Sequence, residues 1–197
     1  MPYEPKNFDH LLGTKGFSDT LLKNHFTLYQ GYVTNVNKLA DTLKKMVEEG
    51  KQGTPEFNEL KRRFGWEFNG MRLHEYYFGN MSKNPTPFNT VSSFGKKVAA
   101  EFSSYATWEK DFKASGAMRG VGWVVLCYDK EAGRLFNVWI NEHDAGYLAA
   151  GIPLLVLDVF EHAYITDYGI KRADYIEAWF KSLDWNAVEQ RFEKAMK

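Results

Sequence analysis

The sequence predicts an α+β protein, with an N-terminal antiparallel helical hairpin followed by a mixed domain that has a three-stranded antiparallel sheet and surrounding helices. Two observations support this class. Up to about residue 80, apolar residues recur every three or four positions, the period of a helix that buries one face. After residue 120, β-branched and aromatic residues gather in three short runs typical of strands. We expect the helical hairpin domain to cover residues 1–84 and the α/β domain to cover residues 85–197.

Two long amphipathic segments form the expected hairpin. The first begins behind Ser18, whose hydroxyl can cap a helix, and continues to a Gln-Gly-Thr-Pro break at residues 52–55. The second covers residues 56–81, and Gly65 and Gly70 predict interruptions within it. Because the break between the two segments is short, the helices should run antiparallel to each other.

The second part should begin after a linker at residues 82–89, which contains two prolines. The expected elements that follow are helices at 91–102 and 107–115, strands at 122–128, 134–140 and 152–158, helices at 161–168 and 175–183, and a last helix from Trp185. Thr107 is the expected cap of the second of these helices. The third strand is apolar on both faces, which predicts a central place in the sheet.

Charge and cysteine content limit the possible functions. Lys+Arg and Asp+Glu balance at 25 each, so no global positive field attracts nucleic acid or an anionic membrane, and any attraction of an anionic substrate must be local. Cys127 is the only cysteine, which excludes an intrachain disulfide and a thiolate metal site. No apolar run approaches the roughly 20 residues that span a bilayer. Residues 1–13 lack the pattern of a signal peptide, so we expect a cytoplasmic protein.

Histidines in apolar segments are the candidates for chemistry. Asp158 ends an apolar strand, and His162 follows it by four residues, so the two side chains can converge on one ion. Taken alone, such a pair is more often a solvated turn or a hydrogen-bonded structural pair. His25 and His74 each lie on the inward face of a hairpin helix, where a simple core histidine bonded to a backbone carbonyl is the ordinary interpretation. Together, three imidazoles and one carboxylate suit iron or manganese, and also zinc.

Several motifs resemble those of the iron/manganese superoxide dismutase family. Residues 158–164 read D-V-F-E-H-A-Y, close to the family signature D-V-W-E-H-A-Y, and I-P-L-L precedes them. The residues Arg172, Tyr175 and Trp179 follow as in the family. Residues 120–123 (G-V-G-W) are similar to the family's G-S-G-W, and residues 32–35 (Y-V-T-N) to its Y-V-x-N.

The resemblance implies a site with one metal ion per subunit. Its protein ligands would be His25, His74, Asp158 and His162, with a water or hydroxide as the fifth ligand. The substrate would be superoxide, which the family converts to dioxygen and hydrogen peroxide by cycling the metal between two oxidation states. Tyr32 would be the tyrosine at the entrance to the site.

The spacing of the first ligand departs from the family pattern. His25 precedes Tyr32 by seven residues, whereas eight is usual. Seven residues bring two side chains to within about 20° on a regular helix, whereas eight require a local bulge. We therefore expect a straighter first helix. The alternative, in which Asn24 takes the ligand position, is chemically poor because an amide is a weak ligand for iron or manganese.

A second departure concerns the glutamine that usually hydrogen-bonds the metal-bound solvent. Gly70 stands four residues before His74, where iron enzymes of the family place it, and residues 141–144 read N-E-H-D where manganese enzymes have N-Q-D. We expect His143 to replace the glutamine, and an exposed loop histidine is the alternative. Either metal remains open, with iron favoured over manganese.

The pocket and the subunit contact are also assigned by the resemblance. Trp123 and Phe160 would line the pocket, and Phe160 replaces a tryptophan of the family. Glu161 would accept a hydrogen bond from the ligand His162 of a second subunit, which predicts a homodimer, with a tetramer as the alternative. Leu28 and Ile165 replace the polar pair that usually meets at this contact, and Tyr29 could take over part of the channel.

Two other classes of function stay open at the level of sequence. A non-catalytic interaction protein with the dismutase fold should have lost ligands, whereas this chain has a candidate for all four. A zinc-dependent hydrolase could use the same His/His/His/Asp set, but it would need a general base, and zinc cannot change its oxidation state.

Overall fold

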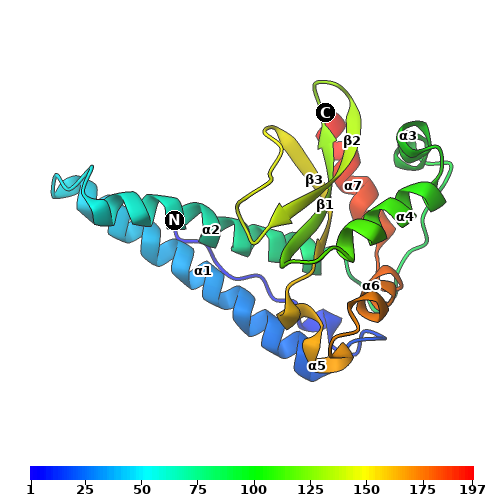
Figure 1. The fold of residues 1–197 in the computed structure, drawn as a ribbon, viewed down its shortest axis with the longest axis horizontal. Helices are drawn as coiled ribbons and strands as arrows, with labels where there is room; N and C mark the ends of the chain where they lie inside the picture. The colour runs from blue at the N-terminus through cyan, green and yellow to red at the C-terminus, as the bar shows by residue number, and fades with distance from the viewer.

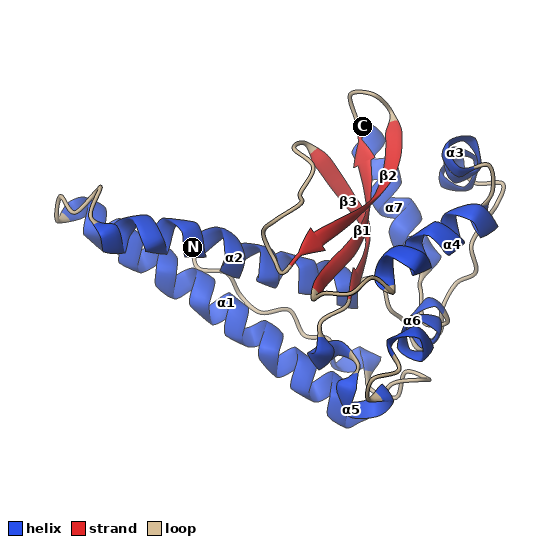
Figure 2. Cartoon of the chain, in the orientation of Figure 1, coloured by secondary structure: helices blue, strands red, loops and turns tan.

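A computed structural model describes residues 1–197 and shows a long helical hairpin that projects from a small sheet with further helices around it (Figure 1). The hairpin is formed by α1 (Asp19–Glu48) and α2 (Pro55–Phe78), and the sheet by β1 (Gly122–Asp129), β2 (Arg134–Asn141) and β3 (Gly151–Asp158). The other elements are α3 (Ser93–Phe102), α4 (Tyr105–Gly116), α5 (Ile165–Tyr168), α6 (Arg172–Phe180), α7 (Trp185–Met196) and 3₁₀ turns at Asp9–Leu11 and Glu161–Ala163. The predicted α+β class is confirmed (Figure 2).

Helix α1 is one regular α-helix of 30 residues with no bulge, as the spacing of its histidine and tyrosine predicts. Ser18 caps it, because its hydroxyl accepts a hydrogen bond from the Leu21 N–H at 3.1 Å. Leucine, phenylalanine, tyrosine and valine side chains on one face are buried against α2 and the rest of the core. The helix ends at Glu48, and Gly50 then adopts a left-handed conformation with φ +69°.

Helix α2 is unbroken through both glycines, so the predicted interruptions are wrong. A glycine inside a helix costs about 1 kcal/mol relative to alanine, which packing of the hairpin can offset. Gly70 has a tertiary reason, because a Cβ there would lie 2.6 Å from Cδ1 of Tyr32. The glycine therefore marks a close approach of α1 to α2 and not the end of a helix.

Some helix boundaries in the second part differ from the prediction. Helix α4 starts at Tyr105, because the hydroxyl of Ser104 accepts the Thr107 N–H at 3.0 Å, so Thr107 lies in the first turn and is not the cap. The helix predicted at 161–168 is divided into a 3₁₀ turn and the short α5. The last helix begins at Trp185 as predicted.

The strand order in the sheet is β2-β1-β3, with both pairs antiparallel. The prediction that β3 is central is therefore wrong. β3 is an edge strand, and it is apolar on both faces because α2 and α7 pack against it. Trp123 at the start of β1 pairs with Ile140 near the end of β2 and with Asp158 at the end of β3. The antiparallel register thus brings the start of one strand and the ends of two others to one end of the sheet.

One continuous core of 41 buried residues includes members of the hairpin, the sheet and the surrounding helices. At the predicted boundary, the Ser82 N–H donates to the carbonyl of Ser182 at 2.8 Å. The division into 1–84 and 85–197 stays a prediction. None of the helices combines the length and the apolar character required to cross a membrane.

Substitution of Gly122 tests how closely the backbones pack at the end of the sheet. Its φ is +147°, and a Cβ at this position would lie 2.1 Å from the carbonyl oxygen of Ile140. We expect Gly122→Ala to lower the free energy of unfolding by about 3 kcal/mol, because backbone atoms would have to move. Denaturant titration measures the effect. Gly31→Ala is the control, since no heavy atom lies within 4 Å of its Cβ position in α1, and it should stabilise by about 0.5–1 kcal/mol. Equal effects of the two substitutions would contradict this account.

Candidate metal centre

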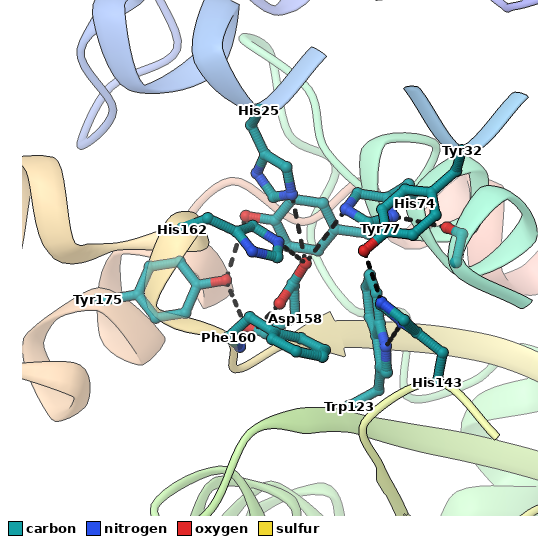
Figure 3. Close-up of polar contacts among 11 residues, drawn as sticks. His25, Tyr32, His74, Tyr77, Trp123, His143, Asp158, Phe160, His162 and Tyr175 are labelled. Atoms are coloured by element: carbon teal, nitrogen blue, oxygen red, sulfur yellow. Dashed lines mark hydrogen bonds and ion pairs between the residues drawn. The ribbon is translucent and has the colours of Figure 1, made fainter. Parts of the chain in front are cut away.

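Four side chains converge between the hairpin and the end of the sheet (Figure 3). His25 comes from α1, His74 from α2, Asp158 from the end of β3 and His162 from the 3₁₀ turn that follows. One potential ligand atom of each lies within 4.8 Å of the others. The Nε2 atoms of His25, His74 and His162 lie 3.2, 3.6 and 3.1 Å from Oδ2 of Asp158. Three imidazole nitrogens therefore surround one carboxylate oxygen.

Hydrogen bonds on the outer side of this group fix the orientation of its members. Nδ1 of His74 lies 2.5 Å from the carbonyl oxygen of Gly70, which can only accept, so Nδ1 carries the hydrogen and the lone pair of Nε2 points inward. Oδ1 of Asp158 accepts the Phe160 N–H at 2.9 Å, which leaves Oδ2 towards the imidazoles. The hydroxyl of Tyr175 donates to the backbone carbonyl of Asp158 at 2.7 Å. Such outer contacts are what orients ligands in metal sites.

The group contains buried polar atoms that the protein leaves unpaired. Four buried side-chain nitrogen or oxygen atoms lack a hydrogen bond, and three of them are Nδ1 and Nε2 of His25 and Nε2 of His74. Although Nε2 of His25 lies 3.2 Å from Asp158, its orientation does not make a hydrogen bond. An unpaired buried polar group costs about 1–3 kcal/mol. Ligands about 2.1 Å from a common ion, at angles of 90–120°, lie about 3.0–3.6 Å apart. The unpaired nitrogens and the three nitrogen distances to Oδ2 of Asp158 are those expected of ligands around a single metal ion.

The charge states of these residues match the requirement of a metal for deprotonated ligands. Burial lowers the pKa of His25, and burial together with the field of His25 lowers the pKa of His74 well below the ordinary value, so both imidazoles are neutral. Burial alone would raise the pKa of Asp158, but the charge and hydrogen bond of His162, together with the nearby His25, outweigh it and hold the pKa below the usual range. The site therefore presents the neutral imidazoles of His25 and His74 and one anionic carboxylate.

His143 lies beside this group, in the turn that follows β2. The Asn141 N–H donates to the Ala145 carbonyl at 2.7 Å, and this closed turn holds the buried imidazole in place. The indole N–H of Trp123 donates to Nδ1 of His143 at 3.0 Å, and Nε2 lies 2.7 Å from the hydroxyl of Tyr32. Because an indole can only donate, Nδ1 is the acceptor and the hydrogen is on Nε2. Nε2–H therefore donates to the oxygen of Tyr32.

Aromatic rings enclose His143 on its remaining sides. Phe160 stacks on it with ring centroids 4.8 Å apart and an interplanar angle of 26°. Trp66 meets it edge-on, also at 4.8 Å but at 84°. Burial lowers the pKa of His143 to about 4, so its imidazole is neutral at pH 7. Burial also raises the pKa of Tyr32, which keeps its phenol protonated.

The structure places the sequence-predicted residues in two groups. Those brought together are His25, His74, Asp158 and His162, with Tyr32, Trp123, His143 and Phe160 beside them. Asn24 is exposed on the other face of α1, so His25 occupies the position facing the other three. The ring of Tyr29 lies 6.4 Å from the His74 ring, but its hydroxyl donates to Glu75 at 3.1 Å and not to the site. Glu161 is exposed at the surface next to His162.

The sequence interpretation missed two residues of α2 near the site, Trp66 and Arg63. Trp66 packs on His143, and the Arg63 guanidinium lies over the Trp66 ring at 4.8 Å. The sequence spacing could have indicated that Arg63 lies on the same face of the helix as His74. Arg63 precedes His74 by eleven residues, which is close to three helical turns.

A family model and several relatives of this chain all carry the name superoxide dismutase. The family model described as iron/manganese superoxide dismutases, C-terminal domain, matches residues 90–191. A protein of Aquifex pyrophilus, named as an iron superoxide dismutase, is 36% identical over 201 residues, which cover 98% of this chain and 92% of the relative. A protein of Haloferax volcanii, named as a manganese superoxide dismutase, is 34% identical over 88% of this chain and 85% of the relative. An iron-named relative from Cupriavidus metallidurans is 34% identical over 92% and 91%.

The lowered pKa of His143 predicts an acid-sensitive part of the stability of the metal-free protein. The folded form resists protonation down to a pKa of about 4, whereas the unfolded form takes up a proton near 6.5. This contribution is complete above pH 6.5 and is lost as the pH falls towards 4. We expect wild type to lose about 2 kcal/mol more than His143→Gln between pH 7 and pH 5, measured by denaturant titration.

His10→Gln is the matched control for this measurement, because His10 is exposed and lies away from the site. It should keep the pH dependence of the wild type. If His143→Gln followed the same curve as His10→Gln, the assignment of a buried neutral His143 would be wrong.

Proposed function

The chain belongs to the iron/manganese superoxide dismutase family, and on this premise we infer that His25, His74, Asp158 and His162 hold one redox-active metal ion per subunit. The protein is an oxidoreductase that converts two superoxide ions and two protons to dioxygen and hydrogen peroxide. The observation that supports the ligand assignment most strongly is the set of unpaired, buried imidazole nitrogens around Oδ2 of Asp158.

The side chains around the candidate ligands can supply a proton, which the reaction needs in addition to the electron. When bound, the metal supplies a one-electron couple that takes an electron from one superoxide and returns it to another. The protein holds a proton at Tyr32, because burial and the nearby carboxylates Asp158 and Glu67 raise the pKa of its phenol. His143 donates to the oxygen of Tyr32, so the Tyr32 O–H hydrogen stays without a partner within the chain and is available to the reactant.

Iron is the metal we favour, with manganese as the alternative. Relatives named as iron superoxide dismutases, from two Aquifex species, match over 98% of this chain, whereas the manganese-named relatives of Haloferax volcanii match over 88%. A zinc hydrolase is disfavoured because zinc cannot change its oxidation state. A non-catalytic interaction protein is disfavoured because all four candidate ligands are present and face one another.

Loading of the purified protein with iron or with manganese tests the function directly. We expect about one ion per chain and rapid decay of superoxide with at least one metal, measured by elemental analysis and a superoxide-decay assay on the same sample. His74→Ala should reduce metal content at least about tenfold, because it removes a ligand. His10→Ala is the control and should bind metal as the wild type does, because its side chain is exposed. Full occupancy by either metal without superoxide decay would contradict the function.

We propose a homodimer in which Glu161 of each subunit accepts a hydrogen bond from His162 of the other. Glu161 is exposed beside His162, and no hydrogen bond within the chain involves Nδ1 of His162. Leu28 and Ile165 are 36% and 51% exposed and could provide the apolar part of a two-fold contact.

A cytoplasmic location is compatible with Cys127 being free and buried.

Substitution of Glu161 tests the subunit contact. Sedimentation at micromolar concentration should show a dimer for wild type, and Glu161→Ala should weaken the dimer at least about tenfold, because a charge-assisted hydrogen bond is lost twice per contact. Glu193→Ala on α7 removes the same charge from an exposed residue without an ion pair and should leave the dimer intact. A monomeric wild type would rule out the proposed contact.

A further inference from the structure

The substrate is a small anion, but the protein has no overall field to attract it. Lys+Arg and Asp+Glu are equal in number, and Asp158 adds a negative charge at the centre of the site. A steered encounter therefore requires a cation placed at the site and held there. The following inference rests on the proposed function.

Arg63 on α2 is such a cation. Its Nε and Nη2 both lie 2.7 Å from Oε1 of Glu67, whose side chain is buried. Glu67 also accepts a hydrogen bond from Asn35 of α1 at 3.2 Å, so the carboxylate is fixed to both helices of the hairpin. The Arg63 side chain is 53% exposed, and its Nη1 makes no hydrogen bond within the chain. The guanidinium is thus anchored on one side and open to an anion on the other.

Two ring contacts connect Arg63 with the residues next to the candidate ligands. The Arg63 guanidinium lies 4.8 Å above the Trp66 ring, and the Trp66 ring lies 4.8 Å from the His143 ring. His143 in turn lies 2.7 Å from the hydroxyl of Tyr32. Figure 3 shows Tyr32 and His143 together on one side of the four candidate ligands. The positive charge therefore stands beside the side of the site where Tyr32 lies.

The charge of Arg63 also reaches this side of the site electrostatically. Its field lowers the pKa of His143, and at Tyr32 it opposes the rise in pKa that burial, Asp158 and Glu67 cause. Among the principal causes of the two shifts, Arg63 is the only lysine or arginine. The negative partner, Glu67, is buried beneath the guanidinium, so the exposed end of the ion pair is positive.

We propose that Arg63 guides superoxide towards Tyr32 and the metal, and that it also raises the affinity of the site for other small anions such as azide. Trp66 supports the guanidinium by a cation–π contact and keeps it above the site. Glu67 holds the fork of the guanidinium and so keeps its free N–H groups outward.

Arg62 provides a matched control, because it is the same residue type at the next position of the same helix. Its guanidinium pairs with exposed Glu59 at 2.9 Å, and its side chain is 73% exposed. Although Arg62 precedes Trp66 by four residues and shares its face of the helix, its guanidinium turns back to Glu59, whereas the guanidinium of Arg63 lies over the Trp66 ring. Arg62→Gln and Arg63→Gln change the net charge equally.

The test compares wild type, Arg63→Gln, Arg63→Lys and Arg62→Gln, each loaded with metal and normalised to bound metal. The first readout is the second-order rate constant for superoxide decay at about 10 mM and about 200 mM ionic strength, since salt screens exposed charges. We expect Arg63→Gln to be about three- to tenfold slower at low ionic strength and to approach wild type at high ionic strength. Arg63→Lys should keep most of the rate, because it keeps the charge. Arg62→Gln should stay within about 1.5-fold of wild type.

The second readout does not depend on turnover. Azide binding to the oxidised, metal-loaded protein is titrated by absorbance, and the dissociation constant should rise about threefold in Arg63→Gln and stay unchanged in Arg62→Gln. An equal loss in Arg62→Gln and Arg63→Gln would overturn the proposal, because it would indicate a general charge effect. A loss in Arg63→Gln that is independent of salt and shared by Arg63→Lys would also overturn it, because it would indicate a structural ion pair alone.

An inactive wild type with full metal occupancy would refute the dismutase function, and the azide titration would still decide whether Arg63 attracts anions to the site.

Discussion

A single carboxylate oxygen, Oδ2 of Asp158, lies within 3.6 Å of three imidazole nitrogens, and much of the fold serves to keep it there. A buried carboxylate without compensation would be protonated or would destabilise the fold. Here its close contacts with His162 and His25 keep it ionised, the Phe160 N–H holds its second oxygen, and burial keeps the imidazoles of His25 and His74 neutral. The group is costly to bury without a cation, because three of its nitrogen atoms make no hydrogen bond. A metal ion bound by this group would therefore stabilise the fold.

Convergence on Asp158 requires both parts of the chain. The hairpin supplies two histidines that are 49 residues apart in sequence but face each other, with ring centroids 5.0 Å apart. The sheet supplies Asp158 and Trp123 as direct partners across β1 and β3, and the turn after β2 adds His143 at the same end. Neither part holds all four candidate ligands, so the packing of α2 against β3 is what assembles the site.

The sequence predicted the parts of this arrangement that depend on local pattern. The helical hairpin, the three strands, the Ser18 cap and the regular first helix all follow from periodicity, from the spacing of His25 and Tyr32 or from one side chain. What it could not predict depends on tertiary contact. The apolar pattern of β3 predicts a central strand, but β3 is an edge strand whose faces are buried by packed helices. Gly70 predicts a break in α2, although its role is to admit the ring of Tyr32, and the link of Arg63 to the site depends on the tertiary contact of Trp66 with His143.

Gly70 also explains why the hydrogen bond to Tyr32 comes from the turn after β2. The Tyr32 ring fills the space that a side chain at position 70 would occupy and lies 5.2 Å from the His74 ring. A donor to its hydroxyl must therefore come from the opposite side, where Trp123 fixes His143 with Nε2–H towards Tyr32. A glutamine amide could accept from the same indole and donate to the same hydroxyl. The imidazole keeps this geometry but can take up a second proton, with a pKa of about 4, so it adds a pH-dependent charge that an amide would not have.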